Sequence, residues 1–219
     1  MNLIGKESLH AVFILKFLFY FVVYLVTKIF KIDACTRLFY NRTVLAVIPF
    51  SYLFMCRFGD CHTVLSSFSR RYYDFIRPHR GMFVVDIGAH IGTFTVRYGK
   101  KLKKSGVVIS IEPEPNNYEL LQINLRLNKL SNVHTLPIAC GSYTGRAILY
   151  LHGFTGHSLI YHSDKCIQVQ QYTLDDLCKE LKVSKIDLIK INAEGAELNI
   201  LRGAQETLTH LRPSRSCSP

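Results

Sequence analysis

The sequence predicts an α/β fold with a parallel sheet and helices on both of its faces. Strand-like and helix-like segments alternate from Gly81 onward, and the apolar runs have the length of strands. Alternation at this interval is typical of parallel sheets whose strands are joined by helices. With 219 residues, 48% of them hydrophobic, the chain is long enough for one such domain and additional segments.

The expected elements follow in chain order. The strands are MFVVDIG, GVVISIEPE, NVHTLPIAC, RAILYLH, CIQVQQYTL and KIDLIKIN. The helices are TFTVRYGKKLKK, NNYELLQINLRLNKL, TLDDLCKEL and AELNILRGAQETLTHL. We expect Thr173 to cap the third of these helices, because a threonine oxygen can accept a hydrogen bond from the first turn.

An apolar segment precedes this domain. Residues 11–30 (AVFILKFLFYFVVYLVTKIF) contain only two charged side chains and have the length that a helix needs to cross a bilayer. Basic residues follow the segment, so the positive-inside rule predicts a single-pass membrane protein whose main domain is cytoplasmic. A hydrophobic helix packed on its own domain, or lying in the membrane surface, is the alternative. The expected divisions are an anchor over 1–33, a lead-in with short strands over 34–72 and the main domain over 73–219.

The charge and the cysteines narrow the function classes. The net charge is +11, and residues 1–80 hold 11 Lys and Arg against 4 Asp and Glu. This distribution favours a membrane-proximal region over a nucleic-acid groove. The seven cysteines form no CxxC pair, which indicates reduced thiols rather than a zinc knuckle or a disulfide framework. The spacing of His152, His157 and His162 suits no common ligand motif, so we expect no metal.

Chemistry is indicated where the strand MFVVDIG ends. Asp86 ends this strand, and Gly88 and Gly92 allow a tight turn before the next helix. In open α/β sheets ligands gather at the carboxyl ends of strands, and glycines let a ligand approach the backbone closely. The dehydrogenase fingerprint fails because His90 and Thr93 occupy two of its glycine positions. A phosphate-binding P-loop fails too, since no Gly-Lys-Ser/Thr follows.

Glu112 ends the second strand, where α/β nucleotide sites place a carboxylate on the ribose hydroxyls. A carboxylate can accept both hydroxyl protons. Together with the glycine turn, Glu112 predicts a nucleoside-type cofactor. The alternative is an ordinary solvent-facing glutamate at a strand end.

Four stretches resemble the FkbM-type methyltransferases, which are class I enzymes that use S-adenosyl-L-methionine: VVDIGAHIGTFTV, ISIEPEPNNYELLQINLRLN, TLDDL and IDLIKINAEGAELNILRGA. The resemblance extends from about Tyr73 to Leu208. It implies a Rossmann-like class I methyltransferase sheet and O-methylation of a hydroxyl on a sugar, a lipid-linked glycan or a small metabolite. It also implies a cofactor site: Asp86, Gly88, Ala89, His90 and Gly92 around the methionine part with Thr93 next to them, Glu112 on the ribose, and Ala139 and Cys140 beside the adenine.

The strand-to-helix turn IDLIKINAEGAELNI carries the candidate catalytic residues. The family pattern here reads K-x-D-x-E-G, and this chain has Asn192 in place of the Asp. Methylation of a hydroxyl requires removal of its proton, which a carboxylate can accept and an amide cannot. Glu194 is therefore the candidate base, unless proximity alone supplies the rate. For Glu197, capping of the following helix explains the residue at least as well as a role in catalysis does. Nucleic-acid bases are not expected acceptors, because no N-P-P-Y motif is present.

The C-terminus departs from the family fold, which has three more strands after the equivalent of KIDLIKIN. The remaining LRPSRSCSP has no apolar run, so we expect these strands to be absent and KIDLIKIN to be an exposed edge. Truncation, or a partner or second copy that completes the sheet, would account for this. Two further functions stay open, a catalytically degenerate membrane-tethered binding protein and an NAD-type oxidoreductase.

Overall fold

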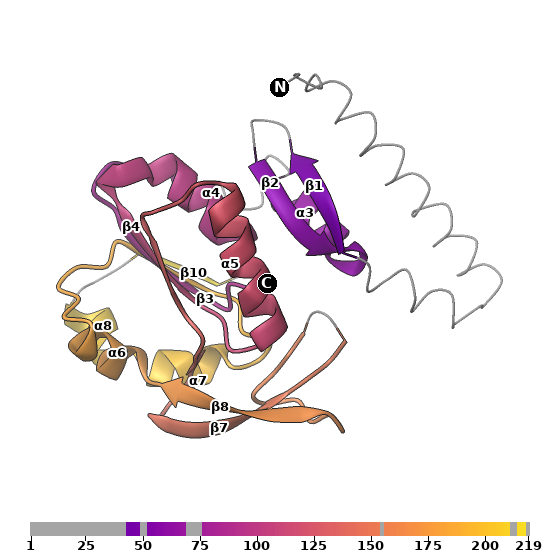
Figure 1. Cartoon of the computed structure of the whole chain (residues 1–219). Helices are drawn as coiled ribbons and strands as arrows, with labels where there is room; N and C mark the ends of the chain where they lie inside the picture. The colour runs from indigo at the N-terminus through magenta and orange to yellow at the C-terminus, as the bar shows by residue number, and fades with distance from the viewer. Residues whose placement is uncertain (1–42, 49–51, 69–75, 154–155, 211–213, 218–219) are drawn as a thin grey trace, which may run out of the picture. The chain divides into compact units, whose positions relative to one another are not determined.

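The computed structural model describes residues 43–48, 52–68, 76–153, 156–210 and 214–217. They belong to two compact units, which lie within residues 1–72 and 73–219 (Figure 1). The apolar segment 11–30, for which the sequence predicts a membrane anchor, lies outside the described residues. Within the described ranges, no helix has the length and apolar character needed to cross a membrane.

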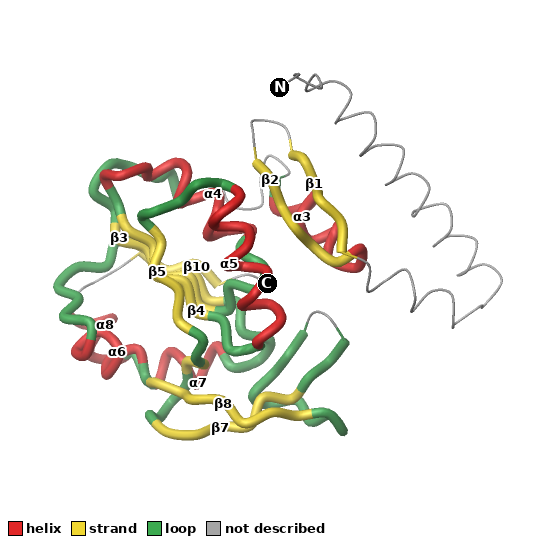
Figure 2. Tube along the Cα trace, in the orientation of Figure 1, coloured by secondary structure: helices red, strands yellow, loops and turns green. Residues whose placement is uncertain are grey.

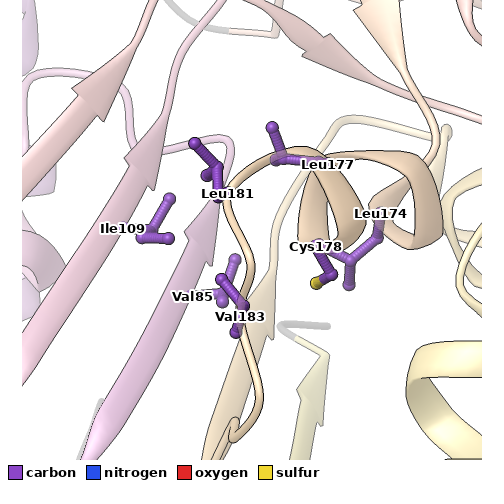
Figure 3. Close-up of a pocket in the computed structure, with 7 residues that line it drawn as sticks. All are labelled: Val85, Ile109, Leu174, Leu177, Cys178, Leu181 and Val183. Carbon is purple, nitrogen blue, oxygen red and sulfur yellow. The ribbon is translucent and has the colours of Figure 1, made fainter.

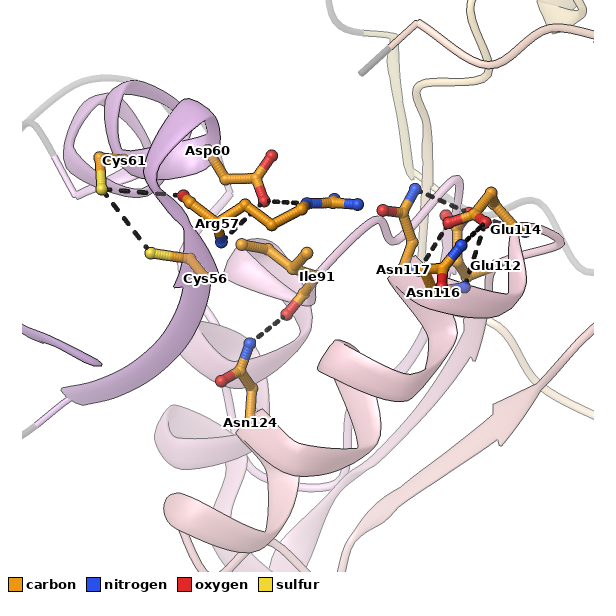
Figure 4. A network of polar contacts seen from close by, with 10 residues as sticks. All are labelled: Cys56, Arg57, Asp60, Cys61, Ile91, Glu112, Glu114, Asn116, Asn117 and Asn124. Atoms are coloured by element: carbon orange, nitrogen blue, oxygen red, sulfur yellow. Dashed lines mark hydrogen bonds and ion pairs between the residues drawn. The ribbon is translucent and has the colours of Figure 1, made fainter. Parts of the chain in front are cut away.

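The first unit contains an antiparallel pair of strands, β1 (Thr43–Ile48) and β2 (Tyr52–Arg57), followed by a 3-10 helix and by α3 (Cys61–Ser67). Asp60 is fully buried at the end of the 3-10 helix. Its carboxylate accepts a hydrogen bond from Arg57 Nε at 2.7 Å (Figure 4). This ion pair gives the buried carboxylate a charged partner, which compensates for part of its desolvation.

The second unit is built on a five-stranded parallel sheet in the order β10-β9-β3-β4-β5. Its strands are β3 (Phe83–Ile87), β4 (Val107–Ile111), β5 (Val133–Leu136), β9 (Leu188–Ile191) and β10 (Ser214–Cys217). Helices cover both faces, with α4 (Thr93–Leu102) and α5 (Pro115–Leu127) on one, and α6 (Leu174–Glu180), α7 (Glu197–Arg202) and α8 (Gln205–His210) on the other (Figures 1 and 2). The predicted α/β sheet is confirmed.

Alternation of side chains along the strands creates a separate core on each face of the sheet. Val84, Val108 and Leu188 pack with the apolar side chains of α4. Their neighbours Val85 and Ile189 point the other way, into the core beneath α6 and α7. Residues two apart share one face of a sheet, so the same alternation decides where the polar residues at the strand ends point.

A smaller three-stranded sheet lies outside the main one, in the order β6-β8-β7. Its strands are β6 (Ala139–Cys140), β7 (Gly145–Tyr150) and β8 (Cys166–Tyr172). The stretch NVHTLPIAC, which we expected as one strand, is divided between β5 and β6. Pro137 lies between the two and has no N–H group for a ladder, so the chain changes sheets there.

The last predicted helix is also divided, into α7 and α8. Gly203 lies so close to the backbone that a Cβ there would be 2.1 Å from the carbonyl oxygen of Gly141. The Asp175 carboxylate, on α6, stabilises the start of α8, because it accepts hydrogen bonds from the N–H groups of Glu206 and Thr207. The predicted cap at Thr173 is confirmed, since its hydroxyl accepts from Asp176 N at 3.0 Å.

The prediction that KIDLIKIN forms an exposed sheet edge is wrong. Ser214–Cys217, which has no apolar run, pairs in parallel with Leu188–Ile191 as strand β10. An edge strand in a parallel sheet is held by its backbone groups, so apolar side chains are not required for it. β9 is therefore an inner strand, and the reason for expecting a partner at its edge no longer applies.

Candidate functional site

The carboxyl ends of three neighbouring strands bring polar residues into one row. The register pairs Asp86 of β3 with Ser110 of β4 on one side and with Lys190 of β9 on the other. All three lie on the face covered by α4, one step beyond its apolar core, because they follow Val84, Val108 and Leu188 by two residues. The row thus separates that core from the loops at the carboxyl edge.

Asp86 is fully buried, and its carboxylate is occupied by partners within the protein. Lys190 Nζ lies 2.9 Å from its Oδ1, and the Lys190 side chain is 3% exposed. The Thr95 hydroxyl, on α4, donates to Asp86 Oδ2 at 2.5 Å and lies 2.7 Å from the Ser110 hydroxyl. A buried carboxylate is tolerated only when it is paired and hydrogen-bonded in this way. Its contact with the methionine part of a cofactor stays a prediction.

Lys190 also fixes the glycine turn, because its Nζ donates to the carbonyl oxygen of Gly88 at 2.9 Å. Gly88 has φ +74°, and a Cβ at this position would lie 1.9 Å from the backbone oxygen of Asn192. We expected this glycine to let a ligand approach. The end of β9 also approaches it, so the turn and β9 are interlocked by backbone contact. The approach of a ligand to Gly88 stays a prediction.

The turn after Gly88 is tied to the end of β4. The N–H groups of Gly88 and Ala89 both donate to the carbonyl oxygen of Ile111 at 3.0 Å, and His90 N donates to Glu112 Oε2 at 2.7 Å. His90 has φ +53°, a left-handed conformation that costs energy in a residue with a side chain. The carboxylate of Glu112 thus holds in place the turn that the sequence assigns to the cofactor.

Glu112 is a buried acid with three donors around it. It is 5% exposed and accepts hydrogen bonds from His90 N, from Glu114 N at 3.1 Å and from Asn117 Nδ2 at 3.4 Å (Figure 4). Burial outweighs these hydrogen bonds and raises the pKa of the Glu112 carboxyl to about 7. Glu112 therefore changes charge near neutral pH, unlike a solvent-facing glutamate.

The N-cap residue of α5 and one residue within this helix support the site and were not found from the sequence. Glu114 caps α5, where its carboxylate accepts from Asn116 N and Asn117 N. Asn124 is fully buried, and its Nδ2 donates to the carbonyl oxygen of Ile91 at 2.8 Å (Figure 4). The glycine turn is thus held from β9, from β4 and from α5. Gly92 and the buried Thr93 begin α4 directly after it.

The turn between β9 and α7 places Asn192 and Glu194 at the same edge. Glu194 has φ +46° and Gly195 has φ +95°, so two successive residues adopt left-handed conformations. Glu197 stabilises them, because its carboxylate accepts hydrogen bonds from Ala193 N and Gly195 N, both at 2.9 Å. The capping interpretation of Glu197 is confirmed.

A loop from the smaller sheet packs on this turn, which the sequence did not reveal. The buried Ser158 hydroxyl donates to the carbonyl oxygen of Glu194 at 2.7 Å. A Cβ on Gly195 would lie 2.7 Å from the ring of Tyr161, which is 61% exposed. Glu194 is exposed and Asn192 is half-buried. An exposed carboxylate, an amide and an aromatic ring therefore lie on or against one turn, where an acceptor could contact them.

Ala139 and Cys140, which were expected beside an adenine, form strand β6 and are both buried. Cys140 packs in the core beneath α6 and α7, and burial raises the pKa of its thiol to about 12. The thiol is thus neutral and is not a nucleophile at physiological pH. The contact of these two residues with a cofactor stays a prediction.

A small pocket between the sheet and α6 is a different feature (Figure 3). Its lining consists of apolar side chains from β3, β4, α6 and the segment after α6, among them Val85, Ile109 and Leu177. These side chains offer no partner for the hydroxyl and amino groups of a nucleoside. The carboxyl edge of the sheet, with its carboxylates and backbone groups, is the candidate active site.

Comparison with known proteins identifies a family for most of the second unit. Residues 86–215 match the family described as the Methyltransferase FkbM domain, which begins at Asp86 and includes both strand-end turns. Methyltransferase sdnD of Sordaria araneosa is 28% identical over 173 residues, which cover 64% of this chain and 66% of that protein. The 2-O-methyltransferase NoeI of Sinorhizobium fredii is 26% identical over 148 residues, which cover 59% of this chain and 60% of that protein.

The fold is also similar to that of a solved structure, the methyltransferase FkbM from Methylobacillus flagellatus. The TM-score is 0.50 with 22% sequence identity, over 69% of this chain and 36% of the other. At this identity the likeness supports the α/β fold alone. The chain spans about three fifths to two thirds of the length of the two curated relatives.

Proposed function

The chain belongs to the FkbM methyltransferase family, and from this premise we propose that it transfers a methyl group from S-adenosyl-L-methionine to an acceptor hydroxyl. The observation that carries the proposal is the junction of Glu112 with the glycine turn. A buried carboxylate at the end of β4 holds the N–H of His90, at the point where nucleoside sites of α/β sheets place a ribose acceptor.

The residues present suit this cofactor. Glu112 offers carboxylate oxygens to the ribose hydroxyls, and the backbone of Gly88 to Gly92 borders the position of the amino-acid part. S-adenosyl-L-methionine supplies a methyl group bonded to a positively charged sulfur. The loops 88–92, 112–116 and 192–197 contain four carboxylates and no Lys or Arg, which favours a cation there.

The acceptor is proposed to be a hydroxyl, in line with the 2-O-methyltransferase among the relatives. Glu194 is the proposed base, because it is an exposed carboxylate on the turn that follows β9. Ser158 and Glu197 position it by holding the backbone of the turn on both sides. The proposed acceptor classes are a sugar, a lipid-linked glycan and a small metabolite, reached from the cytoplasmic side of a membrane to which residues 11–30 tether the chain.

Asn192→Asp tests whether a missing carboxylate limits the reaction. We expect a rise in methyl transfer of at least about tenfold, since positioned acid–base groups contribute 10²- to 10⁴-fold in enzymes. The measurement is incorporation of labelled methyl groups into membrane extracts that contain the variant. Asn192→Ala is the matched control and should not raise activity. Unchanged or lower activity in Asn192→Asp would mean that the amide is adapted to the substrate of this protein.

The affinity for S-adenosyl-L-methionine should depend on pH through Glu112. Ribose hydroxyls donate to the ionised carboxylate, so lowering the pH from 8 to 6, across the pKa of about 7, should weaken binding by about tenfold. In the protein without cofactor, the stability of the fold changes with pH in the opposite direction to the cofactor affinity. The raised pKa stabilises the fold fully below pH 4.5, and this contribution is lost as the pH rises through about 7. Calorimetric titration at several pH values measures the change in cofactor affinity. The control variant Glu112→Gln should bind the cofactor weakly, and its affinity should not change between pH 6 and pH 8.

A second candidate function is a binding protein that has lost catalysis. Asn192 favours it, because an amide stands where the family pattern has a carboxylate. Calorimetric titration of the full chain with S-adenosyl-L-methionine, S-adenosylhomocysteine and NAD separates the candidates. Binding of the first two followed by methyl transfer supports the enzyme, and binding without transfer to any hydroxyl supports the second candidate. Binding of NAD alone would contradict both.

A further inference from the structure

The two edges of the parallel sheet carry opposite charge. At the carboxyl edge, loops 88–92, 112–116 and 192–197 contain four Glu and no Lys or Arg. At the other end of the strands, loops 76–82, 100–106, 126–132 and 181–187 contain ten Lys and Arg and one Asp. We call these four loops the amino edge.

The loops of the amino edge form one connected surface. Val107 N, just after the second loop, donates to the carbonyl oxygen of Met82 in the first at 3.0 Å. Asn132, in the third, donates from Nδ2 to the carbonyl oxygens of Gly99 and Gly106 at 3.1 and 3.2 Å. The fourth is joined to the residue that directly follows the first, because Asp187 Oδ2 accepts from Phe83 N at 2.7 Å.

The basic side chains of this surface point mostly to solvent. Exposed residues come from every loop: Arg77, Arg80, Lys103, Lys104, Lys129 and Lys182. The single carboxylate, Asp187, is engaged by Phe83 N and by Lys185 Nζ at 2.9 Å, so it does not pair with these six. Such a concentration of positive charge attracts an anionic surface within a Debye length.

We propose that the amino edge docks on an anionic lipid surface. Clusters of Lys and Arg close to a membrane are attracted to anionic headgroups. A nucleic acid is the competing anion, but single-stranded binding sites place aromatic rings among the basic residues. The four loops contain no Phe, Tyr or Trp, and the same chain carries the apolar segment 11–30. Because the two edges are opposite ends of the strands, docking would turn the carboxyl edge away from the lipid.

The test measures the acylation rates of individual lysines by mass spectrometry, with the full chain on nanodiscs. Phosphatidylserine discs, compared with pure phosphatidylcholine discs, should slow acylation of Lys103, Lys104 and Lys182 at least about threefold. Lys165, which is exposed and directly precedes β8 of the smaller sheet, should react at the same rate on both kinds of disc. Sodium chloride at about 0.5 M should abolish the difference.

Matched variants locate the effect. The test variant removes three charges of the amino edge and should lose the protection of Lys182: Lys103→Gln, Lys104→Gln and Lys129→Gln. The control variant removes three charges elsewhere and should keep this protection: Arg146→Gln, Lys165→Gln and Arg202→Gln. Equal rates on both kinds of disc, or equal loss of protection in both variants, would overturn the proposal. Protection by single-stranded RNA on phosphatidylcholine discs, without protection by phosphatidylserine, would assign the surface to nucleic acid and overturn it too. None of these outcomes depends on methyl transfer.

Discussion

Gly88→Ala is expected to lower the free energy of unfolding by about 3 to 5 kcal/mol, near the upper end of single substitutions. The new Cβ would lie 1.9 Å from the backbone oxygen of Asn192 and 2.9 Å from its carbonyl carbon, neither of which is the end of a flexible side chain. The strand ends would have to separate, and the positive φ adds its own cost. Urea unfolding of the full chain measures the loss.

Gly81→Ala is the control for Gly88→Ala. Gly81 has φ +77°, close to that of Gly88, but the nearest atom to its added Cβ is 3.9 Å away. It therefore reports the backbone cost alone, which is about 1 to 2 kcal/mol. Equal losses in the two variants would show that the contact with Asn192 does not constrain the turn.

Lys190→Met is expected to cost about 3 to 5 kcal/mol, because it leaves the Asp86 carboxylate buried without its cation. The variant should also bind S-adenosyl-L-methionine more weakly, since the carbonyl oxygen of Gly88 loses the same donor. Denaturant unfolding and calorimetric titration measure the two effects.

Combining Lys190→Met with Asp86→Asn should recover much of the lost stability. The double variant removes both charges, and a neutral pair in a buried site is often as stable as the ion pair that it replaces. The amide oxygen can still accept from Thr95. If the double variant is less stable than Lys190→Met, the ion pair is not the reason for the loss, and the role assigned to Lys190 fails.

The alternation of strands and helices, and the placement of each strand end at one edge, could be predicted from the sequence because they follow from local patterns. The opposite orientation of Lys190 and Ile189 was predictable for the same reason. The partner of Lys190 was not, because the pairing with Asp86 depends on a register between strands about a hundred residues apart. The hydrogen bond from Ser158 to Glu194 likewise joins two sheets.

Errors arose where backbone geometry outweighs side-chain character. β10 has no apolar run, and its pairing with β9 uses backbone groups that no hydropathy pattern reveals. The break between α7 and α8 depends on the close approach of Gly203 to Gly141 and on the Asp175 carboxylate. The close approach of Asn192 to Gly88 was not predicted either, because it depends on the pairing of β3 with β9.

Hydrogen exchange of the full chain with and without S-adenosyl-L-methionine tests most directly whether the carboxyl edge is the cofactor site. We expect slower exchange at the glycine turn, from Gly88 to Gly92, and at Glu114, whose backbone N–H donates to Glu112. The same amides in Glu112→Gln should be much less protected at equal cofactor concentration. Protection confined to residues 174–183, which line the apolar pocket, or no protection at any amide would contradict the account.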